Sequence, residues 1–238
     1  MTANLENQPV CVVTGGTSGI GNAVVRLFAD NSYRIATCGR NPERLASLND
    51  TIATADGHLI QSVDLSDMQQ TQRFGQQTLE HFDRVDVLVN NAAVAPLGSL
   101  EDITQSTFEE MLNINIRSTF YLTQKFWPRM KRQGRGVVVN ISSLAAVDPF
   151  PGFSIYGASK AWIDLMTVAL SAEGKDSNVR VCSIRAGAVE TPLLRGLFPD
   201  FPADQCVSPE QVAQSVFNCV QQPENFPSGQ HFVVTNQT

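Results

Sequence analysis

The sequence contains no long apolar run and no excess of positive charge. These two absences argue against a membrane-spanning protein and against a nucleic-acid-binding protein. No run approaches the roughly 20 apolar residues of a membrane span, so we expect no membrane partner. Residues 1–9 lack the basic and apolar regions of a signal peptide, and residues 1–8 are expected to form a loose N-terminal tail. The net charge of −6 argues against a nucleic acid as the main partner.

Cysteine and histidine are few and widely spaced, which argues against disulfides and metal sites. The five cysteines are Cys11, Cys38, Cys182, Cys206 and Cys219. They are an odd number, and three of them fall in strand-like apolar runs, so we expect buried free thiols. The histidines at positions 58, 81 and 231 form no ligand pattern, and we expect no metal. A reduced, cytoplasmic setting is the default expectation.

The sequence does contain a regular alternation of apolar runs and helical patterns. Apolar runs typical of strands cover residues 10–14, 34–38, 58–63, 85–90, 136–142, 179–184 and 231–234. Helical periodicity between them covers residues 20–30, 42–53, 67–81 and 209–221. Strands that alternate with helices predict an α/β fold with a parallel, doubly wound sheet and helices on both faces.

The ends of these segments carry residues typical of helix starts. Pro42 and Pro209 suit first helical turns, and Asn41, Ser66 and Ser208 suit N-caps. No repeat or linker interrupts the pattern, so we expect residues 1–238 to form one domain. Prolines between positions 192 and 209 mark a long irregular stretch, and residues 192–208 are expected to form a substrate lid.

A glycine-rich turn links the first predicted strand to the first helix. It lets the backbone approach a pyrophosphate closely, and the helix N-terminus offers unpaired N–H groups to the anion. Because the turn stands between a strand and a helix, we interpret it as a nucleotide site rather than a turn without a ligand. The residues expected at the cofactor are Gly15, Thr17, Ser18, Gly19, Ile20 and Gly21.

The end of the second predicted strand indicates which nucleotide binds. Dinucleotide-binding folds that use NAD place a carboxylate there for the ribose 2′-hydroxyl, but this chain has Cys38-Gly39-Arg40-Asn41. Arg40 can instead form charge-assisted bonds to a 2′-phosphate. We therefore predict that NADP is preferred and that NAD remains possible. The alternative is that Arg40 is a solvated loop residue.

The ends of the third and fourth predicted strands supply further candidates. Asp64 and Leu65 follow the third strand and are expected at the adenine, although Asp64 can equally begin the next helix. Asn91 and Ala92 follow the fourth strand, at the carboxyl edge of the sheet where ligands bind. The alternative there is an Asn-mediated turn.

Tyr156 and Lys160 have the spacing that places two side chains on one face of a helix. An ammonium beside the phenol favours the phenolate and is expected to lower the tyrosine pKa. With Ser143 upstream, the group can donate a proton to a carbonyl oxygen. A second pair, Tyr121 and Lys125, has the same spacing, so the spacing alone does not identify the site.

In this order, the motifs resemble the short-chain dehydrogenase/reductase family over nearly the whole chain. The matching positions are Thr14, Gly15, Gly19, Gly21, Asp64, Asn90, Asn91, Ala92, Asn115, Ser143, Tyr156, Lys160, Gly187 and Thr191. The resemblance implies a Rossmann-like domain with about seven parallel strands, assembled as a homodimer or homotetramer. It also implies NAD(P)-dependent interconversion of a carbonyl and an alcohol.

The resemblance assigns roles to the candidate catalytic residues. Tyr156 is then the general acid in reduction, and Ser143 hydrogen-bonds the substrate oxygen. Lys160 is expected to hold the nicotinamide ribose and to lower the tyrosine pKa, while Asn115 supports a proton-relaying water. Tyr156 is chosen over Tyr121 because it follows the fifth strand, which ends near Ser143.

The resemblance also places Gly187, Val189 and Thr191 beside the nicotinamide, with Thr191 on its carboxamide. Three positions depart from the family pattern. Ala93 and Ala186 replace a usual glycine and proline without removing a reacting group. Ser18 stands where NADP users commonly have a basic residue, which leaves Arg40 as the main signal for NADP.

Apolar side chains in residues 144–155 and 192–208 predict an apolar or aromatic carbonyl substrate. The alternative is that they pack the lid or a subunit interface. The basic run at residues 129–135 can attract an acyl-carrier protein or complement a helix C-terminus, which keeps a 3-oxoacyl-(acyl-carrier-protein) reductase as an alternative. A non-catalytic NADP-binding, redox-sensing regulator is the alternative from another class.

Overall fold

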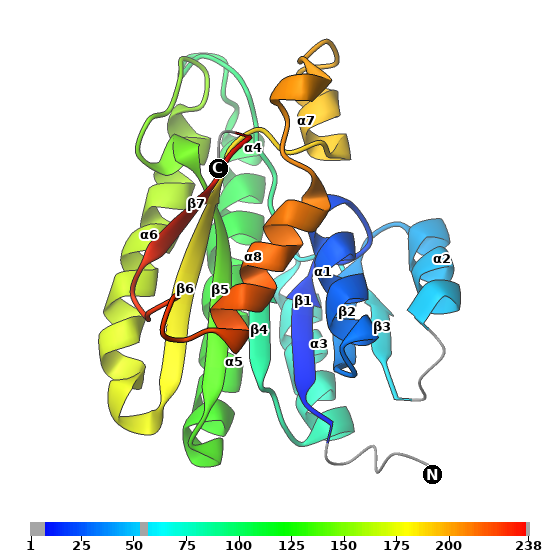
Figure 1. The fold of residues 1–238 in the computed structure, drawn as a ribbon. Helices are drawn as coiled ribbons and strands as arrows, with labels where there is room; N and C mark the ends of the chain where they lie inside the picture. Colours follow the sequence, from blue (N-terminus) through cyan, green and yellow to red (C-terminus); the bar gives the residue numbers. More distant parts are fainter. Residues whose placement is uncertain (1–7, 53–56, 237–238) are drawn as a thin grey trace.

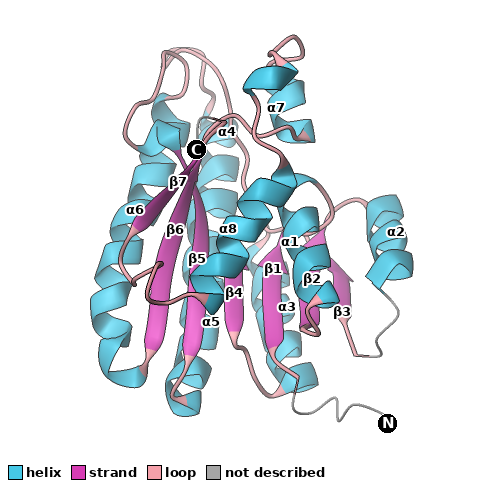
Figure 2. Cartoon of the chain, viewed as in Figure 1, coloured by secondary structure: helices cyan, strands magenta, loops and turns pink. Residues whose placement is uncertain are grey.

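A parallel sheet of seven strands forms the centre of the computed structural model, which describes residues 8–52 and 57–236 (Figures 1 and 2). The strand order is β3-β2-β1-β4-β5-β6-β7. The strands are β1 (Val10–Thr14), β2 (Arg34–Gly39), β3 (Leu59–Ser62), β4 (Val87–Asn90), β5 (Gly136–Ser143), β6 (Val179–Ala186) and β7 (His231–Val234). The predicted Rossmann-like sheet is confirmed. The predicted tail lies outside the described residues up to position 7.

Helices cover both faces of the sheet (Figure 1). They are α1 (Gly19–Asp30), α2 (Pro42–Ile52), α3 (Met68–Phe82), α4 (Gln105–Met111), α5 (Ser118–Gln133), α6 (Ser154–Gly174), α7 (Pro192–Leu197) and α8 (Pro209–Gln221). A π-helical segment, Leu112–Arg117, joins α4 to α5. Within the described part of the chain, no helix is both long enough and apolar enough to cross a membrane.

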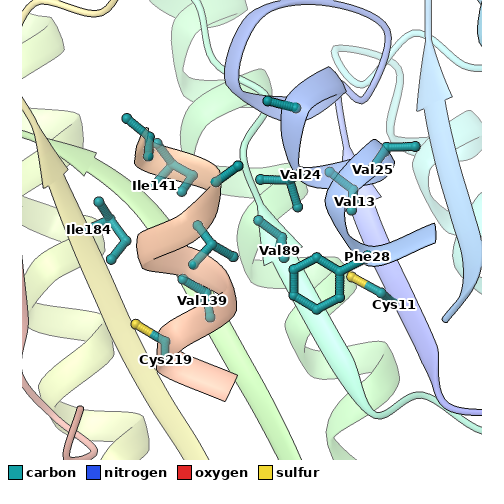
Figure 3. Close-up of a cluster of buried hydrophobic side chains, with 14 of the residues drawn as sticks. Cys11, Val13, Val24, Val25, Phe28, Val89, Val139, Ile141, Ile184 and Cys219 are labelled. Atoms are coloured by element: carbon teal, nitrogen blue, oxygen red, sulfur yellow. The ribbon is translucent and has the colours of Figure 1, made fainter. Parts of the chain in front are cut away.

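Alternate residues of each strand face two separate hydrophobic cores, because successive side chains of a strand point to opposite faces. Cys11 and Val13 of β1 pack with side chains of α1 and α8 on one face, including Phe28. Val10 and Val12 pack with α3 and α5 on the other. Figure 3 shows the first core around Val13 and Phe28. Burial of each such side chain stabilises the fold by about 1.5–3 kcal/mol.

Two of the three predicted N-caps are confirmed. The Asn41 side chain accepts a hydrogen bond from the Arg44 N–H at 2.9 Å, and Ser208 forms a capping box with Gln211. The prediction for Ser66 is wrong, because the N-cap of α3 is Asp67. Ser66 instead bonds to the carboxylate of Asp64, which takes it out of the capping position.

The strand order reverses between β1 and β4, which are neighbours although β2 and β3 lie between them in the sequence. From β1 the chain moves outward to β3, and from β4 it moves outward in the opposite direction to β7. Connections to either side leave the carboxyl ends of β1 and β4 uncovered. Ligands of doubly wound sheets bind at this switch point. The turns that follow β1 and β4 are therefore the expected place for a ligand.

Candidate active site

The turn between β1 and α1 has a backbone geometry that its glycines permit. Gly15 (φ 67°) and Gly19 (φ 51°) adopt left-handed conformations that favour glycine. A Cβ on Gly21 would lie 2.3 Å from the Gly15 carbonyl oxygen, so α1 packs closely on the turn. Among the described residues, the N-cap Ser18 side chain forms no cap hydrogen bond. The first N–H groups of α1 are therefore available to an anion.

The end of β4 holds this turn in place. Asn91 Nδ2 donates hydrogen bonds to the carbonyl oxygens of Thr14, at 2.8 Å, and Gly15, at 3.3 Å. Thr14 Oγ1 accepts from the N–H groups of Asn91 and Ala92, both at 3.0 Å. Asn91 therefore bonds to the glycine turn after β1 and holds its backbone in place.

A cleft of ≈ 760 Å³ opens at this edge of the sheet. Most residues singled out in the sequence line it: Gly15, Thr17, Ser18, Gly19, Ile20, Arg40, Asp64, Leu65, Asn91, Ala92, Ser143, Tyr156, Lys160, Gly187, Val189 and Thr191. Gly21 and Asn115 are buried and support the cleft without lining it. Its volume lies within the range of small-molecule and cofactor sites. No cluster of metal ligands occurs among the described residues.

Ser143, Tyr156 and Lys160 come together at one wall of this cleft. Ser143 ends β5, and its Oγ accepts a hydrogen bond from the Ala145 N–H at 3.1 Å, which fixes the hydroxyl. The Tyr156 hydroxyl forms a side-chain hydrogen bond with Ser143. Lys160 Nζ donates to the Ile141 carbonyl oxygen at 2.8 Å and lies 5.6 Å from the Tyr156 ring centre.

The pKa of Tyr156 differs from the sequence-based expectation. Burial raises the pKa of the phenol, and only the hydrogen bond from Ser143 acts in the opposite direction. Burial also lowers the pKa of Lys160 to about 8, and the Asp164 carboxylate opposes this lowering. The net change in the Tyr156 pKa is therefore opposite to the lowering expected from the Lys160 ammonium, which lies 5.6 Å from the tyrosine ring centre. Both side chains are thus shifted toward their neutral forms.

Asn115 lies at the centre of the π-helical segment between α4 and α5. The structure shows α4, this segment and α5 in direct succession, from Gln105 to Gln133. Asn115 Oδ1 accepts from the Val94 N–H, and its Nδ2 donates to the Val94 carbonyl oxygen, both at 2.9 Å. Nδ2 also lies 3.1 Å from Ser159 Oγ. Asn115 therefore ties the loop after β4 to α6, beside Tyr156 and Lys160.

The second tyrosine–lysine pair lies on a different face of the molecule. Tyr121 and Lys125 belong to α5 and face α3, where Lys125 Nζ donates to Gln76 Oε1 at 2.6 Å. Neither residue lines the cleft formed by the described residues. The pair therefore lies between α5 and α3, away from the cleft.

The far end of the cleft carries two arginines. Arg40 follows β2 and is more than half exposed, with its Nη1 3.7 Å from Glu110 Oε1 of α4. Arg44, in the first turn of α2, also lines the cleft and was missed by the sequence analysis. Its signal was available, since it lies four residues after Arg40. Asp64 lines the same region while its Oδ1 accepts hydrogen bonds from Ser66.

The opposite end of the cleft is apolar and aromatic. Phe150 and Phe153 lie with ring centres 4.3 Å apart, and Phe153 lies 5.0 Å from the Tyr156 ring. Phe198 follows α7 and contacts both phenylalanines, at 5.9 and 6.2 Å. The segment 192–208 is more regular than predicted, because Thr191 caps the short helix α7. It contributes the apolar residues that close this end.

A buried polar network beneath the site escaped the sequence analysis. Asn90 Nδ2 donates to Asn140 Oδ1 at 2.8 Å, and Asn140 Nδ2 lies 2.9 Å from Thr167 Oγ1. Asn90 Nδ2 also lies 3.1 Å from Thr123 Oγ1. These side chains join β4 and β5 to α5 and α6 directly below the cleft. Single polar residues inside apolar segments were the only signal in the sequence.

Known proteins resemble this chain over most of its length. A family model for short chain dehydrogenases matches residues 9–201. A 3-oxoacyl-[acyl-carrier-protein] reductase from Thermotoga maritima is 30% identical, over 93% of this chain and 94% of that protein. The structure of a 3-ketoacyl-(acyl-carrier-protein) reductase from Brucella melitensis complexed with NADH is 25% identical, with a TM-score of 0.86 over 98% of each chain. An alcohol dehydrogenase from Thermococcus sibiricus complexed with 5-hydroxy-NADP is 25% identical, with a TM-score of 0.85 over 97% of each chain.

Proposed function

Because the chain belongs to the short-chain dehydrogenase/reductase family, we propose that it uses NADPH to reduce an apolar carbonyl compound to an alcohol. Membership makes it an NAD(P)-dependent oxidoreductase, and the proposal concerns the direction, the cofactor form and the substrate. The observation that carries it is the Tyr156 hydroxyl, which meets Ser143 in the cleft and whose pKa is raised by burial. A phenol that keeps its proton at neutral pH is suited to donate it.

In the proposed mechanism, Ser143 and Tyr156 both act on the substrate carbonyl oxygen. The Ser143 hydroxyl is fixed by the Ala145 N–H and orients the carbonyl beside the phenol. Tyr156 donates its proton to the oxygen as negative charge develops there. Lys160 supplies a positive charge beside the tyrosine ring, which stabilises the phenolate that remains. The nicotinamide cofactor, when bound, supplies the hydride.

The residues of the cleft fit a dinucleotide. The glycine turn and the N-terminus of α1 offer backbone N–H groups for the pyrophosphate. Asp64 and Leu65 would meet the adenine, and Gly187, Val189 and Thr191 would line the nicotinamide end. Thr191 is held close to the turn, because a Cβ on Gly19 would lie 2.9 Å from its Cγ2. Lys160 would hold the ribose hydroxyls next to Tyr156.

Arg40 and Arg44 support the choice of NADP. Both side chains line the end of the cleft that follows β2, where a ribose 2′-phosphate would lie. Two guanidinium groups match the charge of a phosphate, and neither Arg40 nor its neighbour Asn41 supplies the carboxylate that would favour NAD. Glu110 of α4 opposes this preference, because it pairs with Arg40.

The substrate end of the cleft supports an apolar or aromatic carbonyl compound. Phe150, Phe153 and Phe198 form a connected aromatic cluster there, joined by Leu197 of α7. The Arg195 guanidinium does not offer a site for a substrate anion, because it is paired with Glu190. We therefore propose that residues 192–208 are a lid that closes apolar side chains over the substrate within one catalytic domain.

Two relatives named as acyl-carrier-protein reductases raise the alternative of a thioester substrate. The basic run at residues 129–135 does not support it. It ends α5 and leads into the start of β5, at the opposite end of the sheet from the cleft (Figure 1). Arg129 is paired with Asp83, and Arg135 with Asp86. These arginines therefore stabilise the lower edge of the sheet.

A substrate panel tests the proposed function. NADPH oxidation should be followed by absorbance with aromatic ketones, aliphatic ketones, aldehydes, quinones and oxoacyl thioesters, and each should be repeated with NADH. We expect the highest kcat/KM with an aromatic or large apolar ketone and NADPH. Turnover of oxoacyl thioesters alone would establish the alternative substrate. Tight NADPH binding without any turnover would instead indicate a nucleotide-binding regulator.

We further propose a homo-oligomer in a reduced, cytoplasmic setting. The five cysteines are free, and four of them are buried, as predicted from their spacing. Leu165 and Val168 of α6 are exposed apolar residues on a helix, which is typical of a subunit interface. Cell fractionation with an activity assay tests the location, since activity in an extracellular fraction would contradict it.

A further inference from the structure

A cluster of charged and polar groups lies one helical turn beyond Lys160. Its centre is Asp164 of α6, a carboxylate that is 5% exposed. Ser183 Oγ donates to Asp164 Oδ1 at 2.9 Å, and Arg185 Nε donates to Oδ2 at 2.7 Å. His231 Nδ1 lies 2.7 Å from Ser183 Oγ and 3.6 Å from Asp164 Oδ1. One carboxylate thus joins α6 to β6 and β7.

Asp164 lies on the same face of α6 as two residues of the cleft. Tyr156, Lys160 and Asp164 follow one another at intervals of four residues, so their side chains form one row along the helix. Side chains at this spacing have Cβ atoms roughly 5–6 Å apart. Lys160 and Asp164 are both buried, at 2% and 5% exposure, so water screens their interaction little. The helix itself therefore places the two side chains one turn apart on the same face.

We propose that Asp164 is a positioning residue that keeps the Lys160 ammonium charged in the cleft, and that Arg185 limits this effect by sharing the carboxylate. Burial alone works against the ammonium, as a charge in an apolar site is poorly solvated. The hydrogen bond from Lys160 Nζ to the Ile141 carbonyl oxygen replaces part of the lost solvation, but this oxygen carries no negative charge. Asp164 supplies that charge from the next turn and acts to raise the pKa of Lys160.

Among the described residues, the hydrogen-bonding groups next to Lys160 are uncharged. On β5, Ile141 presents its carbonyl oxygen, and Ser142 Oγ lies 3.4 Å from the Lys160 carbonyl oxygen. Asn115, on the π-helical segment, contacts the adjacent Ser159 through its amide. The phenol of Tyr156 is held neutral at neutral pH, since burial raises its pKa. The positive groups that face Asp164 lie on the neighbouring strands.

Those strands provide two groups of different character. Arg185 of β6 is permanently charged and binds Asp164 directly. His231 of β7 reaches it through Ser183, and burial lowers the pKa of the imidazole although Asp164 opposes the change. His231 is therefore mainly neutral at neutral pH and leaves Arg185 as the cation that competes with Lys160 for the carboxylate. The cluster thus links the edge strand to the cleft.

Lysine NMR tests this proposal on the full chain without cofactor. The sequence has only four lysines, so the side-chain signals of protein carrying ¹³C-labelled lysine are few, and Lys160→Met identifies the Lys160 signal. In Asp164→Asn, we expect the titration midpoint of Lys160 to fall by about 0.5 to 1 from its wild-type value. Asp164→Glu should restore it, while Arg185→Gln should raise it because the carboxylate is released from its partner.

Opposite shifts in these two variants distinguish an electrostatic role from a structural one, since a damaged fold would move the midpoint the same way in both. An unchanged midpoint in folded Asp164→Asn, or a lowered one in Arg185→Gln, would overturn the proposal. If Asp164→Asn does not fold, Arg185→Gln and Asp164→Glu still decide it.

The role for Lys160 rests on the proposed function, but the titration does not. If NADPH reduction of carbonyls proved wrong, the NMR midpoints would stand, and only their link to catalysis would fail. With an active substrate, the alkaline limb of the kcat/KM profile should move down in Asp164→Asn and up in Arg185→Gln. Matching NMR shifts with an unmoved profile would show that Asp164 acts on Lys160 without serving catalysis.

Discussion

Lys160 places an ammonium in a site where water has little access. The side chain is 2% exposed and makes one hydrogen bond to a carbonyl oxygen. Burial lowers its pKa from 10.5 to about 8, so the folded protein binds this proton less tightly than the unfolded chain does. The charge that the proposed mechanism requires is therefore a source of instability, as is common at active sites.

The substitution Lys160→Met should stabilise the protein while it removes activity. Below pH 8, the lowered pKa means that the charged lysine destabilises the folded protein by about 3 kcal/mol, which the substitution removes. The substitution also removes the hydrogen bond to Ile141, which costs roughly 1 kcal/mol of stability. We expect a net gain of about 2 kcal/mol at pH 7 that declines as pH rises from 8 toward 10.5, where the unfolded lysine also loses its proton. Urea unfolding at several pH values measures this gain. A pH-independent difference, or a loss at pH 7, would contradict the account.

Glu110 should weaken the preference for NADP by holding Arg40. In Glu110→Gln, the released guanidinium is expected to bind the 2′-phosphate of NADPH about two- to fivefold more tightly, since exposed ion pairs are weak. NADH binding should not change, and Arg40→Ala should weaken NADPH binding alone. Fluorescence titration of both cofactors measures this. Glu109→Gln is the matched control, because Glu109 instead bonds to Gln105. Equal effects on NADH and NADPH would refute the assignment.

Sequence reasoning found the residues that line the cleft more readily than those that support it. Gly15 and Tyr156 belong to local motifs, and local spacing identified them. The partners of Asp164 lie far along the chain, at Arg185 and His231, and only the pairing of β6 with β7 brings them together. The pKa of Tyr156 was predicted to be lowered and is raised instead, because spacing does not report burial.

Among the elements, the lid depends on one arginine. Arg195 of α7 donates to Glu190 and to the carbonyl oxygens of Pro199 and Phe201, so it ties the middle of the lid to the residues just before it. Loss of these bonds in Arg195→Met should loosen the aromatic end of the cleft, where Phe198 closes it. We expect faster amide hydrogen exchange in residues 192–208 and a severalfold higher KM for the carbonyl substrate.

Glu190→Gln provides the matched control for this element. It removes the ion pair but leaves the bonds from Arg195 to the carbonyl oxygens, so its effect on exchange and KM should be smaller. A lid that exchanges as slowly in Arg195→Met as in the wild type would show that the apolar contacts of α7 hold it without the arginine.

Elements with regular patterns were predicted well, and elements with local irregularity were not. The apolar runs identified all seven strands of the sheet. The helical periodicity predicted α8 over its full range. The π-helical turn around Asn115 could not be predicted from the periodicity of the sequence. The side chain of Asn115 bonds to Val94, which belongs to a different segment of the chain. The helix α7 is six residues long, too short for periodicity to show.

For the whole molecule, the exposed face of α6 predicts association of identical chains. Leu165 is 71% exposed and Val168 45%, and both lie on a rigid helix beside α4. A second copy would cover them and leave the cleft open. We expect Leu165→Glu to reduce the oligomer to a monomer in size-exclusion chromatography with light scattering. Leu100→Glu is the matched control, because Leu100 is 75% exposed in a loop. An unchanged mass for Leu165→Glu would place the interface elsewhere.

The proposed catalysis depends most on the proton donor, and the substitution Tyr156→Phe tests this role directly. It removes one hydroxyl from the cleft and leaves the aromatic contact with Phe153 in place. With the best carbonyl substrate, we expect kcat to fall by at least about a hundredfold, the contribution typical of a general acid, while NADPH binding persists. Tyr121→Phe should retain nearly full activity. An active Tyr156→Phe beside an inactive Tyr121→Phe would contradict the assignment of the site.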